Sequence, residues 1–270
     1  MKKVVVLQKR VGETPLAALR AWQAAHPEVA SAPVSYAGRL DPMASGKLLV
    51  LVGDECKRQA AYTKLDKEYE VEILLDVSSD TGDVLGLPHY ANTVSHPQGR
   101  AITRALAQEV GVHECAYPVF SSKTVKGKPL FMYALEGSLS MITVPTHEER
   151  IYSIQLLSIR TEASATLREH ILKLLELVPR TSEPSKELGE NFRVEVIRPQ
   201  WEKLLGDMLP RDFVILRVRV ACGSGAYMRS LASRIGESLG TKALALSISR
   251  TTIGRYLPLP FTAGLWLYSC

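Results

Sequence analysis

An acidic side chain on a glycine-bounded loop is the residue best suited to chemistry in this sequence. Asp41 stands within the run GRLDPMASG, residues 38–46. Glycine allows backbone angles closed to other residues, and Pro42 biases the residue before it toward an extended conformation. Such a loop presents a carboxylate in a fixed position, as a nucleophile requires. An Asp-Pro turn without a chemical role is the ordinary alternative.

A cation that breaks a local rule is a candidate partner for this carboxylate. Apolar spacing after Tyr227 predicts a helix, and Arg229 falls in its first turn. There a positive charge opposes the helix dipole at a cost of ~0.3–1 kcal/mol. Arg229 also lies at the edge of the apolar stripe, from which an ion pair with Asp41 would keep the carboxylate charged. A surface arginine whose stem covers apolar neighbours is the alternative.

Aromatic and basic residues suggest a nucleic-acid partner. Tyr69 begins an alternating strand, where its ring could stack on a base, although a tyrosine of the core or edge fits the same pattern. Each basic cluster alone is ordinarily solvated, but their recurrence beside loops favours a surface that tracks phosphates. The clusters are Lys9 with Arg10, Lys57 with Arg58, Lys64 with Lys67, and Lys123 with Lys126 and Lys128, interleaved with Tyr62, Tyr69, Phe120 and Phe131.

Composition and spacing exclude other kinds of site. The six histidines and four cysteines show no metal-ligand spacing and no disulfide framework. The sequence has no G-x-x-x-x-G-K-[ST] loop for a mononucleotide, and the turn at 223–225 lacks the flanks of a nucleophile elbow. A net charge of +5 and a pI near 9.0 tilt modestly toward polyanions. No apolar run approaches the length of a membrane span, so we expect a cytoplasmic protein.

The strands and helices expected around these residues indicate an α+β fold with a largely antiparallel mixed sheet flanked by helices and loops. The expected strands are 4–7, 48–52, 69–75, 150–160, 213–221 and 243–253, and the expected helices are 14–25, 99–110, 129–136, 166–177 and 228–239. The stretches 32–47 and 117–128 are expected to be loops. We expect one domain, residues 1–270, with an insertion at about 161–210 that contains a flexible linker at 179–191.

Four blocks, taken in order, resemble the TruB family of tRNA pseudouridine synthases over most of the chain. They are 37–46 with 51–57, 67–71 with 80–86, 118–122 with 127–134, and 225–231. Asp41 matches the family's catalytic aspartate, Tyr69 its active-site tyrosine and Arg229 the arginine that pairs with the aspartate. The residues expected at the substrate are Tyr36, Gly38, Arg39, Lys57, Lys67, Lys128 and Tyr227.

Three departures from the family pattern stand out. Tyr36 replaces a histidine that helps displace or stack near the target base, and it could stack similarly. The first loop, 8–14, differs from the family's lysine-proline form. The chain also leaves no room for the small C-terminal PUA domain of many relatives, so we expect that domain to be absent and the insertion to be a candidate for replacing some of its contacts.

The resemblance implies an enzyme that isomerises a uridine, in the T arm of tRNA, to pseudouridine. It would flip the base out of a folded RNA, attack the sugar or the base with Asp41, and need no cofactor and no metal. A monomer is expected. A non-catalytic RNA-binding or RNA-folding protein on the same scaffold is one alternative. A small-molecule enzyme with an Asp nucleophile, such as a hydrolase, is another, and its ligand binding would be insensitive to salt.

Overall fold

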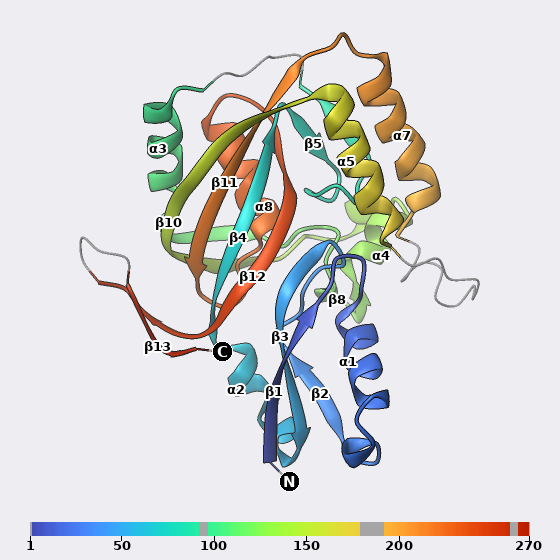
Figure 1. Cartoon of the computed structure of the whole chain (residues 1–270), viewed down its shortest axis with the longest axis vertical. Coiled ribbons are helices and arrows are strands. Elements are labelled where there is room, and N and C mark those ends of the chain that lie inside the picture. Colours follow the sequence, from blue (N-terminus) through green and yellow to red (C-terminus); the bar gives the residue numbers. More distant parts are fainter. Residues whose placement is uncertain (1, 92–96, 179–191, 260–263, 270) are drawn as a thin grey trace.

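The computed structural model describes residues 2–91, 97–178, 192–259 and 264–269, and the predicted linker at 179–191 lies outside them. A nine-stranded sheet organises the fold (Figure 1). Its strands are β1 (Lys2–Lys9), β2 (Val34–Ala37), β3 (Ala44–Gly53), β4 (Asp66–Leu75), β7 (Gly111–Ala116), β10 (Thr146–Ala163), β11 (Asp212–Cys222), β12 (Ala243–Leu257) and β13 (Leu265–Ser269). The order is β1-β3-β12-β4-β11-β10-β7, with β2 against β3 and β13 against β12.

Neighbouring strands of this sheet run antiparallel, apart from β3 and β12. Those two pair in parallel over residues 44–46 and 248–250, at the end of the predicted nucleophile loop. The strands approach so closely that a Cβ on Gly46 would lie 2.3 Å from the carbonyl oxygen of Arg250, and Gly46 has a φ of +103°. Only glycine fits there. The predicted α+β fold with a mostly antiparallel sheet is confirmed.

Helices cover the sheet on two faces. The described α-helices are α1 (Pro15–Ala24), α2 (Gln59–Thr63), α3 (Gly99–Gln108), α4 (Leu130–Leu135), α5 (Ser164–Glu176), α7 (Val194–Asp207) and α8 (Met228–Ser238). Short 3-10 helices span Pro27–Val29, Asp54–Arg58 and Leu139–Met141, and two small hairpins pair β5 (Val77–Ser79) with β6 (Pro88–Tyr90) and β8 (Thr124–Val125) with β9 (Lys128–Pro129). No helix in the described ranges has the length and apolar composition that a membrane crossing requires.

The period of two along each strand separates the two cores. In β11, Val214 and Leu216 pack with α3 and α8, whereas Phe213 and Ile215 pack with α5 and α7. Both faces of the sheet are therefore buried under helices at this end. Figure 1 shows α5 and α7 side by side on one flank, with α3 and α8 elsewhere on the sheet. The second half of the chain thus supplies a helical layer of its own within residues 161–210.

Local signals located most elements, and the exceptions have a physical cause. Thr14 accepts a hydrogen bond from the backbone N–H of Ala17 as the predicted N-cap of α1. The expectation of an unbroken loop at 32–47 is wrong, because β2 and the start of β3 lie inside it. Pairing with distant strands overrides the low strand propensity of that composition. Likewise, 117–128 contains β8 and part of its hairpin.

Candidate active site

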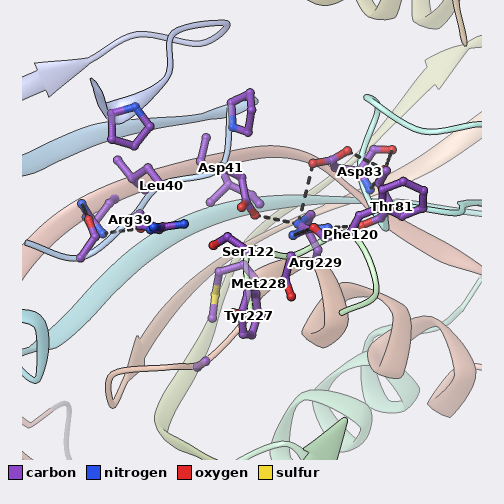
Figure 2. Close-up of a pocket in the computed structure, with 18 of the residues that line it drawn as sticks. Arg39, Leu40, Asp41, Thr81, Asp83, Phe120, Ser122, Tyr227, Met228 and Arg229 are labelled. Atoms are coloured by element: carbon purple, nitrogen blue, oxygen red, sulfur yellow. Dashed lines mark hydrogen bonds and ion pairs between the residues drawn. The ribbon is translucent and has the colours of Figure 1, made fainter. Parts of the chain in front are cut away.

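A pocket of about 630 Å³ lies where several distant parts of the chain meet. The loop before β3, the start of β4, the loop after β5, residues 120–122 and the N-terminal end of α8 line it. Figure 2 shows Asp41 and Arg229 pointing toward one another within it. The lining mixes apolar walls with a few charged groups, which is the usual make-up of a site for a small organic group.

The predicted ion pair is present in this pocket. Nε of Arg229 donates to Oδ2 of Asp41 over 2.7 Å. The side chain of Arg229 is 4% exposed, whereas that of Asp41 is 37% exposed. The carboxylate is therefore held from the protein side by a buried cation and faces the pocket with its remaining surface. Charge-assisted hydrogen bonds of this length are among the stronger ones in proteins.

The rest of the Arg229 guanidinium is also bonded. Nη1 donates to the carbonyl oxygen of Thr81, and Nη2 donates to that of Phe120 over 3.1 Å. Burial alone would lower the pKa of Arg229, but the charges of Asp41 and Asp83 outweigh it and raise the pKa. These partners compensate for a cation in the first turn of α8, and they fix its orientation from two separate loops.

A second carboxylate stands behind the arginine. Oδ2 of Asp83 lies 3.9 Å from Nε of Arg229, and its Oδ1 accepts hydrogen bonds from Thr81 Oγ1 over 2.8 Å and from the Leu85 N–H over 2.9 Å. Burial raises the pKa of Asp83, and the charge of Arg229 opposes the shift. Asp83 thus holds its own loop in shape and adds negative potential behind the cation, whereas Asp41 alone of the two carboxylates is well exposed to the pocket.

The loop that carries Asp41 is fixed upstream by Arg250 of β12, which is 1% exposed. Its Nη1 donates to the carbonyl of Arg39 and its Nη2 to that of Gly38, each over 3.2 Å. Its Nε donates to the carbonyl of Lys47 over 2.7 Å. The guanidinium therefore joins the two ends of the loop around Asp41.

A buried lysine fixes the same loop downstream. Lys9 of β1 is 2% exposed, and its Nζ donates to the carbonyls of Ala44 over 2.5 Å, Pro42 over 3.1 Å and Arg10 over 2.8 Å. Burial lowers the pKa of Lys9 to about 8. Its cluster with Arg10 was expected to face RNA phosphates, and for Lys9 that expectation is wrong, since backbone acceptors occupy the ammonium inside the fold.

Tyr69 lies in the wall of the pocket on β4. It is 8% exposed, and burial raises its pKa, while the guanidinium of Arg250 acts in the opposite direction. The hydroxyl therefore stays protonated at neutral pH. Tyr69 is both a core residue and a pocket residue, because it packs in the core and part of it borders the pocket.

Comparison with known sequences identifies the family. The model of the TruB family pseudouridylate synthase (N-terminal domain) matches residues 29–173, which is more than half of the chain. This chain belongs to the TruB family. The TruB resemblance of its four sequence blocks is thereby confirmed.

Similar TruB proteins extend over most of this chain. It is 27% identical over 250 residues to the tRNA pseudouridine synthase B of Xanthomonas campestris pv. campestris (strain 8004), which covers 93% of this chain and 63% of that protein. It is 34% identical over 221 residues to the protein of the same name from Caldicellulosiruptor saccharolyticus, covering 82% of this chain and 58% of that protein. The chain therefore spans slightly less than two thirds of the length of these relatives.

A solved structure supports the fold. The crystal structure of a Cbf5-Nop10-Gar1 complex contains a chain that aligns with a TM-score of 0.53 at 17% identity. The alignment covers 93% of this chain and 48% of that one. At this identity the likeness concerns the arrangement of strands and helices.

Five of the seven residues that the TruB resemblance places at the substrate line the pocket. These are Tyr36, Gly38, Arg39, Lys67 and Tyr227. Lys67 does so without offering a free charge, because it is 5% exposed and its Nζ donates to the carbonyls of Thr63 and Leu65. Burial lowers the pKa of Lys67 to about 8. An expected phosphate contact by its ammonium is therefore not supported.

The other two predicted substrate residues lie outside the pocket lining. Lys57 is paired with Asp54 over 2.8 Å on the surface. Lys128 forms an ion pair with Glu136, and its Nζ stands 4.5 Å from the centre of the Tyr133 ring. The structure thus brings the TruB nucleophile loop, tyrosine and arginine together, and separates these two lysines from them.

Sequence reasoning missed the roles of Asp83 and Arg250. Asp83 stood inside the TruB-like block 80–86, without a function of its own. Arg250 interrupts the apolar pattern of the predicted strand at 243–253, and that interruption was the available signal. Among the described residues, no three His, Cys, Asp or Glu side chains are grouped as metal ligands would be.

Proposed function

We propose that this protein isomerises a uridine in the T arm of tRNA to pseudouridine, with Asp41 as the nucleophile. The half-exposed Asp41 carboxylate carries the proposal, since the buried Arg229 holds it in a pocket of about 630 Å³ in a TruB-family chain. The relatives named tRNA pseudouridine synthase B support the reaction and the substrate. The proposal includes a monomer that acts in the cytoplasm without a bound metal or cofactor.

The residues of the pocket fit each step of this isomerisation. The target uridine would leave its RNA stack and enter the pocket, where Tyr69 contacts the base. Asp41 attacks the nucleoside at the sugar or at the base, and the N1–C1′ bond breaks. The uracil turns, C5 bonds to C1′, the bond between Asp41 and the nucleoside breaks, C5 loses its proton and N1 gains one. Product and substrate contain the same atoms, so the reaction needs no external oxidant or reductant.

Arg229 sets the position of the attacking group. Its Nε–H donates to Oδ2 of Asp41 over 2.7 Å, so the carboxylate is held in one orientation toward the pocket. Arg229 itself donates to carbonyl groups of two loops, so the orientation of its guanidinium is fixed by the fold. The cation therefore orients the nucleophile before substrate arrives, which is a source of rate enhancement.

The test is carbodiimide mapping of pseudouridine in unmodified tRNA transcripts treated with wild-type protein or with Asp41→Asn. This change is nearly isosteric and removes the nucleophilic charge. We expect a single T-arm signal with the wild type and none with the variant, while both bind tRNA with similar affinity. Affinity should fall steeply as salt rises. Binding without a signal across a whole tRNA pool would instead support an RNA-binding protein, and salt-insensitive binding of a small molecule would support the hydrolase alternative.

A further inference from the structure

The predicted insertion reaches the pocket through two residues at the start of α7. Phe192 and Arg193 both line the pocket, and their φ values of 44° and 60° lie in the left-handed region. Two consecutive left-handed residues that are not glycine persist only where surrounding contacts fix them. The contacts that do so therefore indicate what this part of the chain is for.

Arg193 joins two loops of the pocket. Its Nη1 donates to Oδ2 of Asp80 over 2.7 Å and its Nη2 to Oδ1 over 3.2 Å, so the pair is bidentate. Its guanidinium carbon lies 4.4 Å from the centre of the Phe120 ring. Asp80 belongs to the loop after β5 and Phe120 to the loop after β7. A planar guanidinium can pair with both oxygens of a carboxylate through two parallel N–H bonds while its face lies against an aromatic ring.

The same helix holds the first of these loops at a second point. Nε1 of Trp201 in α7, which is fully buried, donates to the carbonyl of Val84 over 3.0 Å. The loop is thus attached to α7 at Asp80 and again at Val84. Between these points lie Thr81 and Asp83, which are the residues that contact Arg229.

We propose that Arg193 is a positioning residue for the nucleophile, an inference that rests on the proposed function. Thr81 and Phe120 present their carbonyls to the guanidinium of Arg229, and Arg193 fixes the spacing between the loops that carry them. Arg229 in turn orients Asp41. The helices α5 and α7 thereby act on the chemistry through the orientation of one cation, without contact with the reacting atoms.

The test compares Arg193→Met with Arg198→Met. Arg193 immediately precedes α7 and Arg198 lies within it; both form ion pairs, and their side chains are 24% and 32% exposed. Arg198 pairs with Glu176 and Glu202, outside the pocket. We expect Arg193→Met to lower the single-turnover rate constant on tRNA by about ten- to a hundredfold, because small misplacements of reacting groups have effects of that size. The dissociation constant for tRNA should change less than about twofold, and Arg198→Met should change neither quantity.

Asp80→Asn provides an independent variant. It should lower the rate constant by a similar factor, and the double variant should be no slower than either single variant, because both changes break one contact. Circular dichroism and thermal unfolding verify that each variant is folded. Weaker tRNA binding with a flatter salt dependence and an unchanged rate would assign Arg193 to an RNA phosphate and overturn the positioning role. Unchanged rate and affinity would reduce the pair to a structural contact and overturn it equally.

A spectroscopic measurement separates this inference from the proposed function. The Arg229 Nε–H resonance, assigned in ¹⁵N-labelled protein with Arg229→Lys, should shift in Arg193→Met and stay in place in Arg198→Met. If the wild type modifies no tRNA, the proposed function fails, yet this resonance still decides whether Arg193 positions Arg229. An unmoved resonance would contradict the inference whatever the activity.

Discussion

On one side of the pocket buried cations hold the backbone, and on the other side the backbone holds a buried cation. Lys9 and Arg250 donate to carbonyls before and after Asp41, and so fix the loop that presents the nucleophile. Arg229 donates to two carbonyls from opposing loops and, through Nε, to the Asp41 carboxylate. One arrangement fixes a loop, and the other fixes a charge.

The difference between the two sides shows in their response to pH. Carbonyl groups carry no net charge, so they do not repay the burial of Lys9, whose pKa falls to about 8. Arg229 has Asp41 and Asp83 as neighbours, and its pKa rises despite burial. The positive charge of Arg229 beside Asp41 therefore persists, whereas the Lys9 ammonium that holds the loop can lose a proton under alkaline conditions.

Removing the permanent charge should have the largest effect. Arg229→Met would leave Asp83 buried without its cation and Asp41 without its partner. We expect the rate constant for pseudouridine formation to fall about a thousandfold or more, and the free energy of unfolding to fall by about 3–5 kcal/mol. Single-turnover kinetics and denaturant titration measure the two quantities. Arg229→Lys, which keeps the charge, should lose less of both, and a Met variant within tenfold of wild-type activity would refute this account of the ion pair.

Removing the Lys9 ammonium, which holds the loop that carries Asp41, should have an intermediate effect. Lys9→Met would remove the ammonium donor from the carbonyls of Pro42 and Ala44, of which Pro42 keeps the Gly12 N–H over 2.9 Å. Each lost hydrogen bond costs about 0.5–1.5 kcal/mol. The loop should relax, and the rate constant should fall by about ten- to a hundredfold. Lys3→Met is the matched control, because Lys3 lies exposed on the same strand. Equal activity of the two variants would show that β1 does not hold the nucleophile loop.

Lys9→Met also tests how the free energy of unfolding and the activity depend on pH. Between pH 8 and the ordinary lysine pKa of 10.5, the unfolded chain holds more protons at Lys9 than the folded chain does. The free energy of unfolding therefore rises with pH across this window, by up to about 3 kcal/mol from this group. Activity should move the opposite way, because a neutral amine has two N–H donors for three carbonyls. Both trends should weaken in Lys9→Met when it is compared with wild type over pH 7–10.

The smallest effect is expected at the rim of the pocket. The carbonyl of Arg39 is held by Arg250, whereas its exposed side chain lines the pocket. Arg39→Met should leave the rate constant at saturating tRNA unchanged and flatten the slope of log affinity against log salt by about 1. Lys203→Met, an exposed change on α7, serves as control. A lower rate constant at saturating tRNA would show that the Arg39 side chain acts in the chemical step. It would contradict the assignment of that side chain to RNA binding alone.

Side-chain partners proved easier to predict from sequence than backbone partners. The Asp41–Arg229 pair was predicted because a cation in the first turn of a helix is unfavourable without an anion, and because the TruB resemblance pairs Arg229 with the catalytic aspartate. Lys9 and Arg250 bond to carbonyls, which every residue possesses, so composition gives no sign of which ones they will meet. Their burial, and not their partners, was the property a sequence could have suggested.

The elements that sequence missed depend on distant neighbours. The helix α7 contains Pro199, which weakens a local helical signal, yet Ile197, Trp201 and Leu205 bury it against the sheet. β2 and the first residues of β3 are defined by their pairing with other strands, and their own composition does not predict that pairing. The role of Arg193 was invisible for a similar reason, because its partners Asp80 and Phe120 lie far away in the chain.

The parallel pairing of β3 with β12 sets an order of assembly during synthesis. Arg250 and Gly38 are 212 residues apart, and Arg229 and Asp41 are 188 apart. Closing loops of this length is slow compared with forming a helix or hairpin. In a nascent chain, Lys9 of β1 can hold the Asp41 loop early, whereas the contacts with Arg229 and Arg250 form only after α8 and β12 have emerged. If the proposed function holds, a chain truncated before α8 would therefore carry the Asp41 loop without two of the cations that fix it.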